Sequence, residues 1–596
     1  MDKQRLIPLI VATALFMENM DATVIATSLP AIAADIGTSP LTLKLAITSY
    51  LLSLAVFIPA SGWTADRFGA RMVFAIAIGV FMVGSIGCAL SQSVTHFVIA
   101  RILQGMGGAM MTPVGRLVLL RSIDKSALVN AMTWVTVPAL IGPVIGPPLG
   151  GFITTYFSWH WIFLINIPIG LLGIFLALRY IDPIRGEHPE RFDLYGLVMA
   201  GIGLAGIAFG LSVAGLNLLP WTVVAGLVAI GAISMTLYVI HARKTNSPVL
   251  DFSLLRLPTL RASIYGGFLF RLGIGALPFL LPLLMQVGFG LSPFQSGLVT
   301  FSSAVGAMGM KTLAARIIRT FGFRNMMTVN AVVSSVFLAA CALFTVTTPL
   351  TLIFLILVVG GFFRSLQFTA INTVAYAEVE PAQMARATTL VSVNQQLAMS
   401  AGVAVGAFSV ESTLLWHNAI ELDASMFAPA FLVVAIISAV SAYFFWQMPD
   451  DAGHEISGRK AVEISSRKGA EKPPQKPPAK APRTRGISGW AESTPSPPLR
   501  APICCVTSVT AAIRPVAYSC DHGWREWSRS RDQRETTMTN FKNSDRTAIN
   551  LLDDVALESV AGGVKDGGCI PGRRLPPAFP TGDWTFKDVF KRWTIG

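Results

Sequence analysis

Long apolar runs, repeated along most of the chain, are the feature that most limits its fold. From Leu6 to Met448 the sequence alternates predominantly hydrophobic stretches with short polar connections. Each stretch has about 20 residues, enough to cross about 30 Å of hydrocarbon as an α-helix. The stretches are continuous rather than alternating in polarity, so a closed β-barrel is excluded. The sequence therefore predicts an all-α membrane protein.

Composition agrees with this prediction and narrows the partners. The 596 residues are 53% hydrophobic and only 13% charged, whereas soluble proteins carry about a quarter charged residues. The net charge of +13 is shared by the parts before and after Pro449, so no basic patch for nucleic acid is predicted. Six cysteines without C-x-x-C spacing indicate neither a disulfide framework nor a zinc site.

The apolar runs resolve into fourteen predicted spans. In chain order they are Leu6–Leu29, Leu45–Trp63, Val73–Ser91, Phe97–Leu117, Leu128–Thr155, Trp161–Tyr180, Leu194–Ala214, Trp221–His241, Ala262–Val287, Phe294–Met310, Met326–Val346, Leu350–Thr373, Ala387–Val410 and Phe427–Gln447. The first span is not a cleavable signal peptide, because Glu18, Asn19 and Asp21 interrupt it.

Basic residues in the connections predict the orientation. They occupy the even-numbered loops, for example Arg67 and Arg71 in the second, whereas the odd-numbered loops are nearly free of them apart from Lys44. Cytoplasmic loops of membrane proteins carry the excess of Lys and Arg. We therefore expect a multi-pass protein of the cytoplasmic (inner) membrane with both termini in the cytoplasm.

The connection between the second and third spans carries the most specific motif. Residues 62–71 read GWTADRFGAR, which resembles the G-x-x-x-D-R-x-G-x-[RK] signature of the major facilitator superfamily. Glycine permits a tight turn, and a carboxylate that pairs with a cation in one conformation biases a two-state equilibrium. Positive-inside anchoring by the arginines is the alternative. The predicted gating loop comprises Gly62, Asp66, Arg67, Gly69 and Arg71.

The fourth span contains a buried basic motif. Residues 101–108 read RILQGMGG, similar to the superfamily's R-x-x-Q-G-x-G motif. An arginine at the centre of a membrane helix costs at least about 2.5 kcal/mol. Arg101 is therefore expected to face a cavity or a carboxylate, unless it snorkels to the interface. Gln104 is a candidate for lining the pathway.

The fifth span resembles the antiporter signature G-P-x-x-G-P-x-x-G-G of the same superfamily. Residues 142–151 read GPVIGPPLGG. The glycines permit close helix packing, and the prolines remove backbone donors and kink the axis. We predict a bent gate helix, with a kinked helix of no functional meaning as the alternative. The motif residues are Gly142, Pro143, Gly146, Pro147, Gly150 and Gly151.

The start of the sixth span identifies a branch. Residues 159–170 read WHWIFLINIPIG, resembling the W-R-W-x-F-x-x-N-x-P hallmark of the fourteen-helix drug:proton antiporters. His160 stands where arginine is usual; it could titrate near neutral pH or simply lie at the interface. Asn166 is a second candidate for lining the pathway.

The first span supplies the predicted proton carrier. Residues 16–25 read FMENMDATVI, similar to the F-M-x-x-L-D-x-T motif of this branch. An acid in an apolar cavity can exchange a proton near neutral pH, so we assign proton coupling to Asp21, with Glu18 and Arg101 as partners. Glu18 lies three residues earlier on roughly the same helical face. The alternative is a structural role for either acid.

The second half of the sequence is less regular. Residues 315–324 read ARIIRTFGFR at the position of the repeated loop, with Arg319 in place of the acid. The segment from Asn394 to Gly406 resembles the Q-Q-x-x-x-S-x-G-V-A motif of the branch. Buried polar groups line the pathway or bond between helices. The candidates are Arg271, Arg364, Asn394, Gln395 and Gln396.

The resemblance covers residues 1 to about 450 and implies the major facilitator fold. It implies a bundle of six helices over residues 1–182, two inserted helices over 183–261 and a second bundle over 262–449. The tail, 450–596, is expected to be disordered, with a Pro- and Lys-rich stretch from Lys472. From residue 538 it resembles a double-glycine leader, which indicates either fused coding or an ordinary tail.

The resemblance implies proton-coupled export of hydrophobic or cationic drugs or natural products, with a small-molecule substrate, protons and the lipid bilayer as partners. A proton-coupled importer on the same fold and a membrane sensor are the alternatives. A periplasmic adaptor and an outer-membrane channel are candidate partners. We predict no metal site, no cofactor and no enzymatic activity. The sequence has no His-Glu-x-x-His or Gly-x-Ser-x-Gly motif, and Met310 stands where a nucleotide-binding Walker motif requires the glycine before lysine.

Overall fold

The structure is a computed structural model that describes residues 3–123, 128–183, 192–214, 219–419, 422–449 and 452–453. Within these ranges all regular secondary structure is helical. The predicted disordered tail, with the leader-like segment from residue 538, lies outside the described residues.

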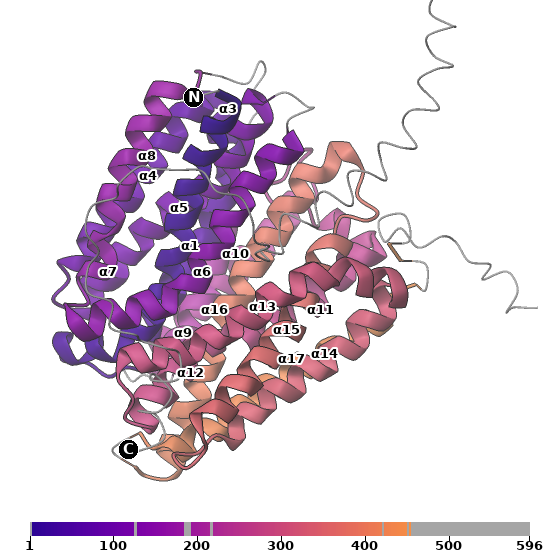
Figure 1. Cartoon of the computed structure of the whole chain (residues 1–596). Helices are drawn as coiled ribbons and strands as arrows, with labels where there is room; N and C mark the ends of the chain where they lie inside the picture. The colour runs from indigo at the N-terminus through magenta and orange to yellow at the C-terminus, as the bar shows by residue number, and fades with distance from the viewer. Residues whose placement is uncertain are drawn as a thin grey trace, which may run out of the picture. The chain divides into compact units, whose positions relative to one another are not determined.

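The described helices follow one another along the chain (Figure 1). The first bundle contains α1 (Lys3–Ile36), α2 (Lys44–Phe57), α3 (Ser61–Phe68), α4 (Ala70–Ala89), α5 (Val94–Ser122), α6 (Leu128–Tyr156), α7 (Trp161–Leu164) and α8 (Asn166–Tyr180). The inserted pair is α9 (Leu194–Val213) and α10 (Trp221–Ala242). The second bundle contains α11 (Pro258–Gly275), α12 (Leu277–Leu283), α13 (Pro293–Phe321), α14 (Phe323–Ala340), α15 (Leu350–Val374), α16 (Met384–Trp416) and α17 (Phe427–Trp446).

The predicted number of crossings is confirmed. Among the described residues, thirteen continuous helical stretches are long and apolar enough to cross a membrane. They include the composite stretches Lys44–Phe68 and Pro258–Gly288, in which short helical elements follow without a break. The 29-residue helix α6, which covers the fifth predicted span, is the fourteenth.

Helices pair within each bundle, and one large apolar cluster contains residues of both bundles, which meet mainly along two helix pairs. In the first bundle α1 packs on α6 and α4 on α5, while in the second α13 packs on α15 and α17 on α11 and α14. Between the bundles, α6 contacts α13 and α2 contacts α16. These pairings give the two six-helix bundles expected from the sequence. The boundaries at 182 and 261 remain predictions.

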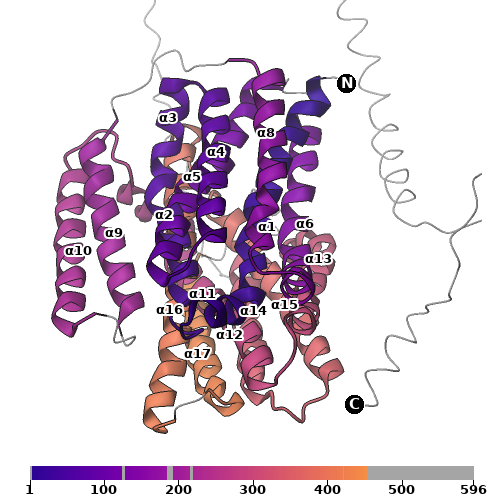
Figure 2. The same ribbon diagram turned by 90° about the vertical axis from the view of Figure 1, so that its left-hand side faces the viewer.

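The inserted helices stand beside the bundles rather than between their cores. Figure 2 shows α9 and α10 as a pair on one side, next to α2. Helix α9 contacts α2 of the first bundle and α16 of the second. An apolar cluster that includes Ala55, Tyr238, Leu254 and Ala387 joins the inserted pair to both bundles.

Polar contacts between the bundles gather at the end where α2 begins and α16 finishes. Lys44 Nζ lies 3.6 Å from Glu411 Oε2, and Gln286 Nε2 donates to the carbonyl of Thr27 over 2.9 Å. We call this the Glu411 end. The opposite end, where α3 leads into α4, is the Asp66 end.

Candidate functional site

An ion pair at the centre of the first bundle joins its first and fourth spans. Arg101 Nη1 of α5 donates to Asp21 Oδ2 of α1 over 2.7 Å, and both side chains are almost fully buried, at 1% exposure each. Arg101 Nε donates to the carbonyl of Ala46 over 3.1 Å. The buried arginine therefore faces a carboxylate, as its cost in a membrane requires.

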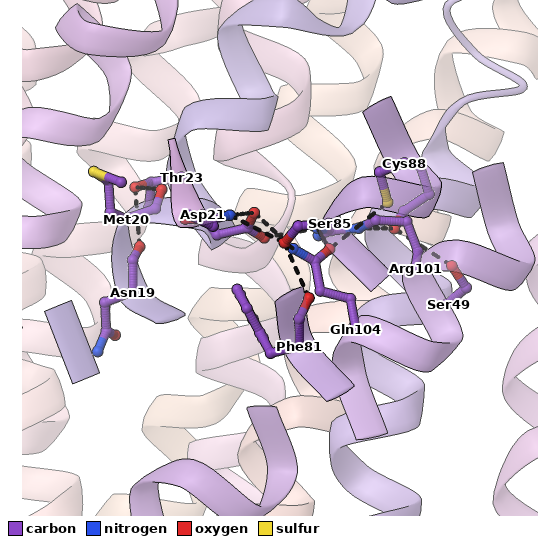
Figure 3. A network of polar contacts seen from close by, with 12 residues as sticks. Asn19, Met20, Asp21, Thr23, Ser49, Phe81, Ser85, Cys88, Arg101 and Gln104 are labelled. Atoms are coloured by element: carbon purple, nitrogen blue, oxygen red, sulfur yellow. Dashed lines mark hydrogen bonds and ion pairs between the residues drawn. The ribbon is translucent and has the colours of Figure 1, made fainter. Parts of the chain in front are cut away.

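Two amide side chains complete the coordination of Asp21, and Figure 3 shows one of them, Gln104, beside Asp21 and Ser85. Gln104 Nε2 and Asn166 Nδ2 donate to Asp21 Oδ1 over 2.8 and 2.9 Å. Both amides also reach Ser85 Oγ, at 2.8 and 3.2 Å. We refer to these five side chains, Asp21, Ser85, Arg101, Gln104 and Asn166, as the charged network. Among the described residues, its acid accepts hydrogen bonds from one guanidinium and two amides.

Glycines let the helices that carry the network approach one another. A Cβ on Gly84 would lie 2.5 Å from the backbone nitrogen of Gln104, and one on Gly105 would lie 2.7 Å from Ser53 Cβ. Helices α2, α4 and α5 therefore touch backbone to backbone at this level. In a bilayer, helices do not associate through the hydrophobic effect, and small residues stabilise their association by allowing this close packing.

Tyr50 of α2 covers the guanidinium of Arg101. The Arg101 Cζ lies 4.2 Å from the centre of the Tyr50 ring, and the cation–π attraction is worth about 2 kcal/mol when desolvated. Tyr50 is 1% exposed, yet its hydroxyl has no hydrogen-bond partner.

Glu18 lies outside the charged network. Its Oε2 accepts a hydrogen bond of 2.8 Å from Thr112 of α5, and the side chain is only partly buried. Among the described residues, no basic nitrogen lies within 4.0 Å of its carboxylate as an ion pair. The two acids of the first span therefore have different surroundings, although the sequence places them on one helical face.

The predicted gating loop is mostly helix. Gly62 lies inside α3, where a Cβ would meet nothing within 4 Å, so a turn at Gly62 is not found. The only break falls at Gly69, whose φ of 93° favours glycine. Hydroxyls that bond back to the preceding turn, such as Ser61 to Ile58, accompany the continuation of α2 into α3.

Charged residues of this motif bond within the first bundle. Asp66 accepts from Arg121 Nη2 of α5 over 2.5 Å, and Arg71 Nη1 donates to the carbonyl of Ile181 over 3.4 Å. Arg67 is exposed. The acid thus has the cationic partner that the motif led us to expect.

The antiporter motif forms a glycine stripe on α6. A Cβ on Gly142 would lie 3.0 Å from the carbonyl of Phe16, and one on Gly150 would lie 2.5 Å from that of Val24. Gly146 lies between them against Thr23, so all three glycines face α1. Gly151 instead faces the other bundle, where a Cβ would lie 2.8 Å from Phe294 Cα. Pro143 and Pro147 lie inside the helix without ending it.

The polar candidates of the second bundle do not form one site. Arg271 of α11 donates to Asn372 Oδ1 over 2.6 Å, and its Nε and Nη1 have no partner. Arg364 donates to Ser303 on α13. Asn394 donates to the carbonyl of Ile264 over 3.1 Å, while Gln395 and Gln396 are partly buried on α16.

His160 contacts the two residues that precede it in the chain. Its ring stacks on Trp159 with centroids 3.8 Å apart, and Nδ1 lies 2.7 Å from Ser158 Oγ. Trp159 Nε1 donates to Asp35 over 3.1 Å. Both interpretations of His160 drawn from the sequence remain predictions.

Sequence reasoning missed Ser85 and Tyr50. Serine and tyrosine are unremarkable inside an apolar span, and neither belongs to a motif that we recognised. The sequence did contain a signal for Ser85. It follows Gly84, and a glycine in a membrane helix often marks the place where another helix approaches closely. Nothing in the sequence alone placed Tyr50 over Arg101.

Comparison with known proteins places the chain in a family. A profile described as Major Facilitator Superfamily matches residues 11–403 and 264–520. The chain belongs to this superfamily. It is therefore a member of a family of membrane transporters, and not of a family of enzymes.

Curated relatives match over most of the chain. Proteins of Salmonella heidelberg (strain SL476) and Salmonella typhimurium (strain LT2), provisionally named multidrug resistance protein MdtD, are each 38% identical over 460 residues. Each alignment covers 76% of this chain and 97% of the relative.

Solved structures share the fold at low sequence identity. A D-xylose-proton symporter has a TM-score of 0.54 at 16% identity, covering 75% of this chain and 98% of the symporter. The nucleoside transporter NupG has a TM-score of 0.52 at 13% identity, with 74% and 99% covered. These likenesses support the fold.

Proposed function

We propose that this superfamily member is a proton-coupled exporter of hydrophobic or cationic small molecules, and that Asp21 carries the coupled proton. The observation that carries the proposal is the buried ion pair of Asp21 with Arg101. Burial strengthens electrostatic interactions, so the protonated and the ionised form of Asp21 interact with Arg101 at very different energies. Proton uptake at Asp21 therefore changes which arrangement of the first bundle is stable.

Protonation has a defined structural consequence. A protonated Asp21 loses the charge-assisted bond to Arg101, and a buried guanidinium without a counter-charge is costly. Arg101 must then find another partner, which shifts α5 relative to α1. The glycine stripe packs α6 closely against α1, and α6 contacts α13 of the second bundle. A movement of α1 against α5 is therefore passed to the interface between the bundles.

The contacts between the bundles define the state of the structure. Lys44 and Glu411 hold the bundles together at the Glu411 end, and the loop charges assign this end to the outside. We infer from the loop charges that this state is the one closed to the outside and that both termini lie in the cytoplasm. Release of substrate requires the Glu411 end to separate while the Asp66 end closes, the alternation expected of such repeats.

The MdtD relatives carry the substrate proposal. Their name refers to multidrug resistance, and 97% of their length aligns with this chain. The glycine stripe on α6 is part of the motif that resembles the antiporter signature, which favours export over import on the same fold. Whether a periplasmic adaptor and an outer-membrane channel extend the path stays a prediction from the sequence.

The test compares wild type, Asp21→Asn and Glu380→Gln in inverted membrane vesicles with an imposed pH gradient. Ethidium, an aromatic cation, reports transport by fluorescence. We expect Asp21→Asn to abolish gradient-driven accumulation, because asparagine cannot exchange a proton, and to leave ethidium counterflow without a gradient in place. Glu380 is exposed, so Glu380→Gln is the matched control. Equal gradient-driven rates for wild type and Asp21→Asn would remove Asp21 from the mechanism.

A further inference from the structure

We propose that a cavity between α14 and α15 binds a chloride ion, which serves as the counter-charge of Arg364. The proton-coupled export proposed above does not require such a site, so the two proposals stand independently. The basis of this one is an arginine without an acidic partner, next to a space of ionic size that a second unpartnered polar group also lines.

The cavity lies in the second bundle, where α14 packs against α15. About 10 Å³ of it is open to the centre of a water-sized particle, which is about the space that one water molecule or one monatomic ion needs. Its polar lining residues are Ser334, Cys341 and Arg364, and apolar side chains such as Phe337 and Leu357 form the rest of the wall. The space therefore suits a small ion and not an organic substrate.

Arg364 brings a permanent positive charge to this cavity, because a guanidinium stays protonated in proteins and carries five N–H donors. Among the described residues, it donates one hydrogen bond, to the hydroxyl of Ser303, and belongs to none of the ion pairs. The thiol of Cys341, which lines the same cavity, is close enough to act on the guanidinium electrostatically. The charge is therefore on the cavity side and has donors to spare.

The helices of the second bundle contain no acid that could neutralise this arginine. Within the bounds of α11 to α17, Glu411 is the only Asp or Glu, and it lies 3.6 Å from Lys44 at the Glu411 end. A half-buried arginine at membrane depth is costly without a counter-charge. An anion from solution is the counter-charge that remains for Arg364.

The first bundle shows the role that such an anion takes over. The spacing R-x-x-Q occurs in both bundles, as RILQ at 101–104 in α5 and as RSLQ at 364–367 in α15, further along its helix. The glutamine of each motif bonds to the helix before it, α4 or α14. Arg101 meets the carboxylate of Asp21, whereas Arg364 meets the cavity. A chloride ion there would supply the negative charge that the second bundle lacks.

Ser334 of α14 supplies a second group for the ion. It is 2% exposed, and its hydroxyl has no hydrogen-bond partner, although a buried polar group ordinarily has one. A chloride ion in the cavity would accept this O–H and face the guanidinium of Arg364. Gly360 lets the two helices approach here, because a Cβ on it would lie 3.2 Å from Phe337 Cβ. The ion would thus join α14 to α15 and stabilise the folded protein.

The test measures thermal unfolding of the purified full-length chain in detergent, with sodium chloride replacing sodium gluconate at constant ionic strength. Gluconate is too large for the cavity, and it keeps the screening of surface charges constant. A ligand that binds only the folded protein stabilises it more as its concentration rises. We therefore expect the unfolding temperature of wild type to rise by a few degrees as chloride replaces gluconate.

Variants assign this effect to the cavity. Arg364→Gln should abolish the chloride-dependent rise, and Ser334→Ala, which removes only the hydroxyl, should reduce it. Arg319→Gln is the matched control, because Arg319 is exposed in the same bundle and its loss should leave the rise intact. If Arg364→Gln does not fold, Ser334→Ala carries the test.

Bromide, a heavier halide, locates the ion by anomalous X-ray scattering from crystals of the wild type. A peak between Arg364 and Ser334 supports the inference, and bromide bound only elsewhere overturns it. An unfolding temperature of wild type that does not respond to chloride also overturns it, as does an equal response in Arg364→Gln or, where that variant does not fold, in Ser334→Ala. Stabilisation by formate and not by chloride would assign the cavity to a carboxylate instead and refute the chloride site. Proton-coupled export is tested separately at Asp21, so it stands or falls on other measurements.

Discussion

The charged network shows what one residue can tell about its neighbours. An arginine in an apolar span predicts a nearby carboxylate, because an isolated charge there is costly, and Arg101 indeed meets Asp21. The sequence also singled out Gln104 and Asn166, which the structure brings to the same carboxylate. The roles of these residues in transport remain proposals.

Removing one member of the ion pair should be worse than removing both. We expect Arg101→Met to destabilise the protein by about 3–5 kcal/mol, because Asp21 is then buried without its counter-charge. The double variant Asp21→Asn, Arg101→Met should recover part of this loss. Thermal unfolding of the detergent-solubilised protein measures both.

Arg316→Met is the matched control for this comparison, since Arg316 is exposed and should leave the unfolding temperature nearly unchanged. A single Arg101→Met variant as stable as wild type would mean that Asp21 is not ionised in the folded protein. That result would also remove the physical basis of the proposed proton coupling.

At the scale of elements, the two bundles repeat a backbone design that the side chains only partly share. Gly69 precedes α4 with a φ of 93°, and Gly322 precedes α14 with a φ of 75°. Two residues later, Arg71 and Arg324 donate to carbonyls of Ile181 and Trp446, at or just past the last helix of their own bundle. The repeat was visible in the sequence through glycine and arginine, despite Arg319 in place of the acid.

The helical state of residues 61–68 could not be predicted from the motif. A signature rich in Gly and charged residues indicates a loop, yet Gly62 and Asp66 continue the second span as α3. Helix propensity is a weak prior, and tertiary contacts such as the Asp66–Arg121 pair override it. Only the positive φ at Gly69 required a glycine, and the sequence alone did not distinguish it from Gly62.

Two glycines of these elements should respond to alanine in opposite directions. A Cβ on Gly150 would lie 2.5 Å from the carbonyl of Val24, so Gly150→Ala must push α6 away from α1 and should cost roughly 1–3 kcal/mol. Gly62→Ala meets open space inside a helix and should stabilise by up to about 1 kcal/mol. Unfolding temperatures measure both signs. A tolerated Gly150→Ala with normal stability would show that the stripe does not set the distance between α1 and α6.

At the scale of the whole molecule, the number of crossings was predictable and the meeting of the bundles was not. The bilayer fixes the length of each span and requires every backbone group to bond within its helix, so fourteen spans follow from hydrophobicity alone. The pairing of α6 with α13 and of α2 with α16 depends on small residues and single polar contacts. Lys44 looked like a loop residue in the sequence, yet it is fully buried against Glu411.

The Lys44–Glu411 pair offers a test of the closed end. We expect Lys44→Glu to weaken closure, because two buried acids then face each other across the interface, whereas the reversed pair Lys44→Glu, Glu411→Lys should restore it. Closure is measured by oxidative cross-linking of cysteines introduced at Thr155 and Phe294, whose side-chain hydroxyl and backbone nitrogen lie 3.1 Å apart across the same end. The native cysteines are replaced by serine.

A change in how often this end is closed should also change the transport rate, since a bond that is present in one state only biases the equilibrium between states. Several-fold less cross-linking in Lys44→Glu, recovered by the reversed pair, would identify the ion pair as one that keeps the Glu411 end closed. Equal cross-linking in all three proteins would mean that the glycine contact of Gly151 with Phe294, and not the charges, holds the bundles together there. In that case Gly151→Val, rather than a charge reversal, should open the Glu411 end.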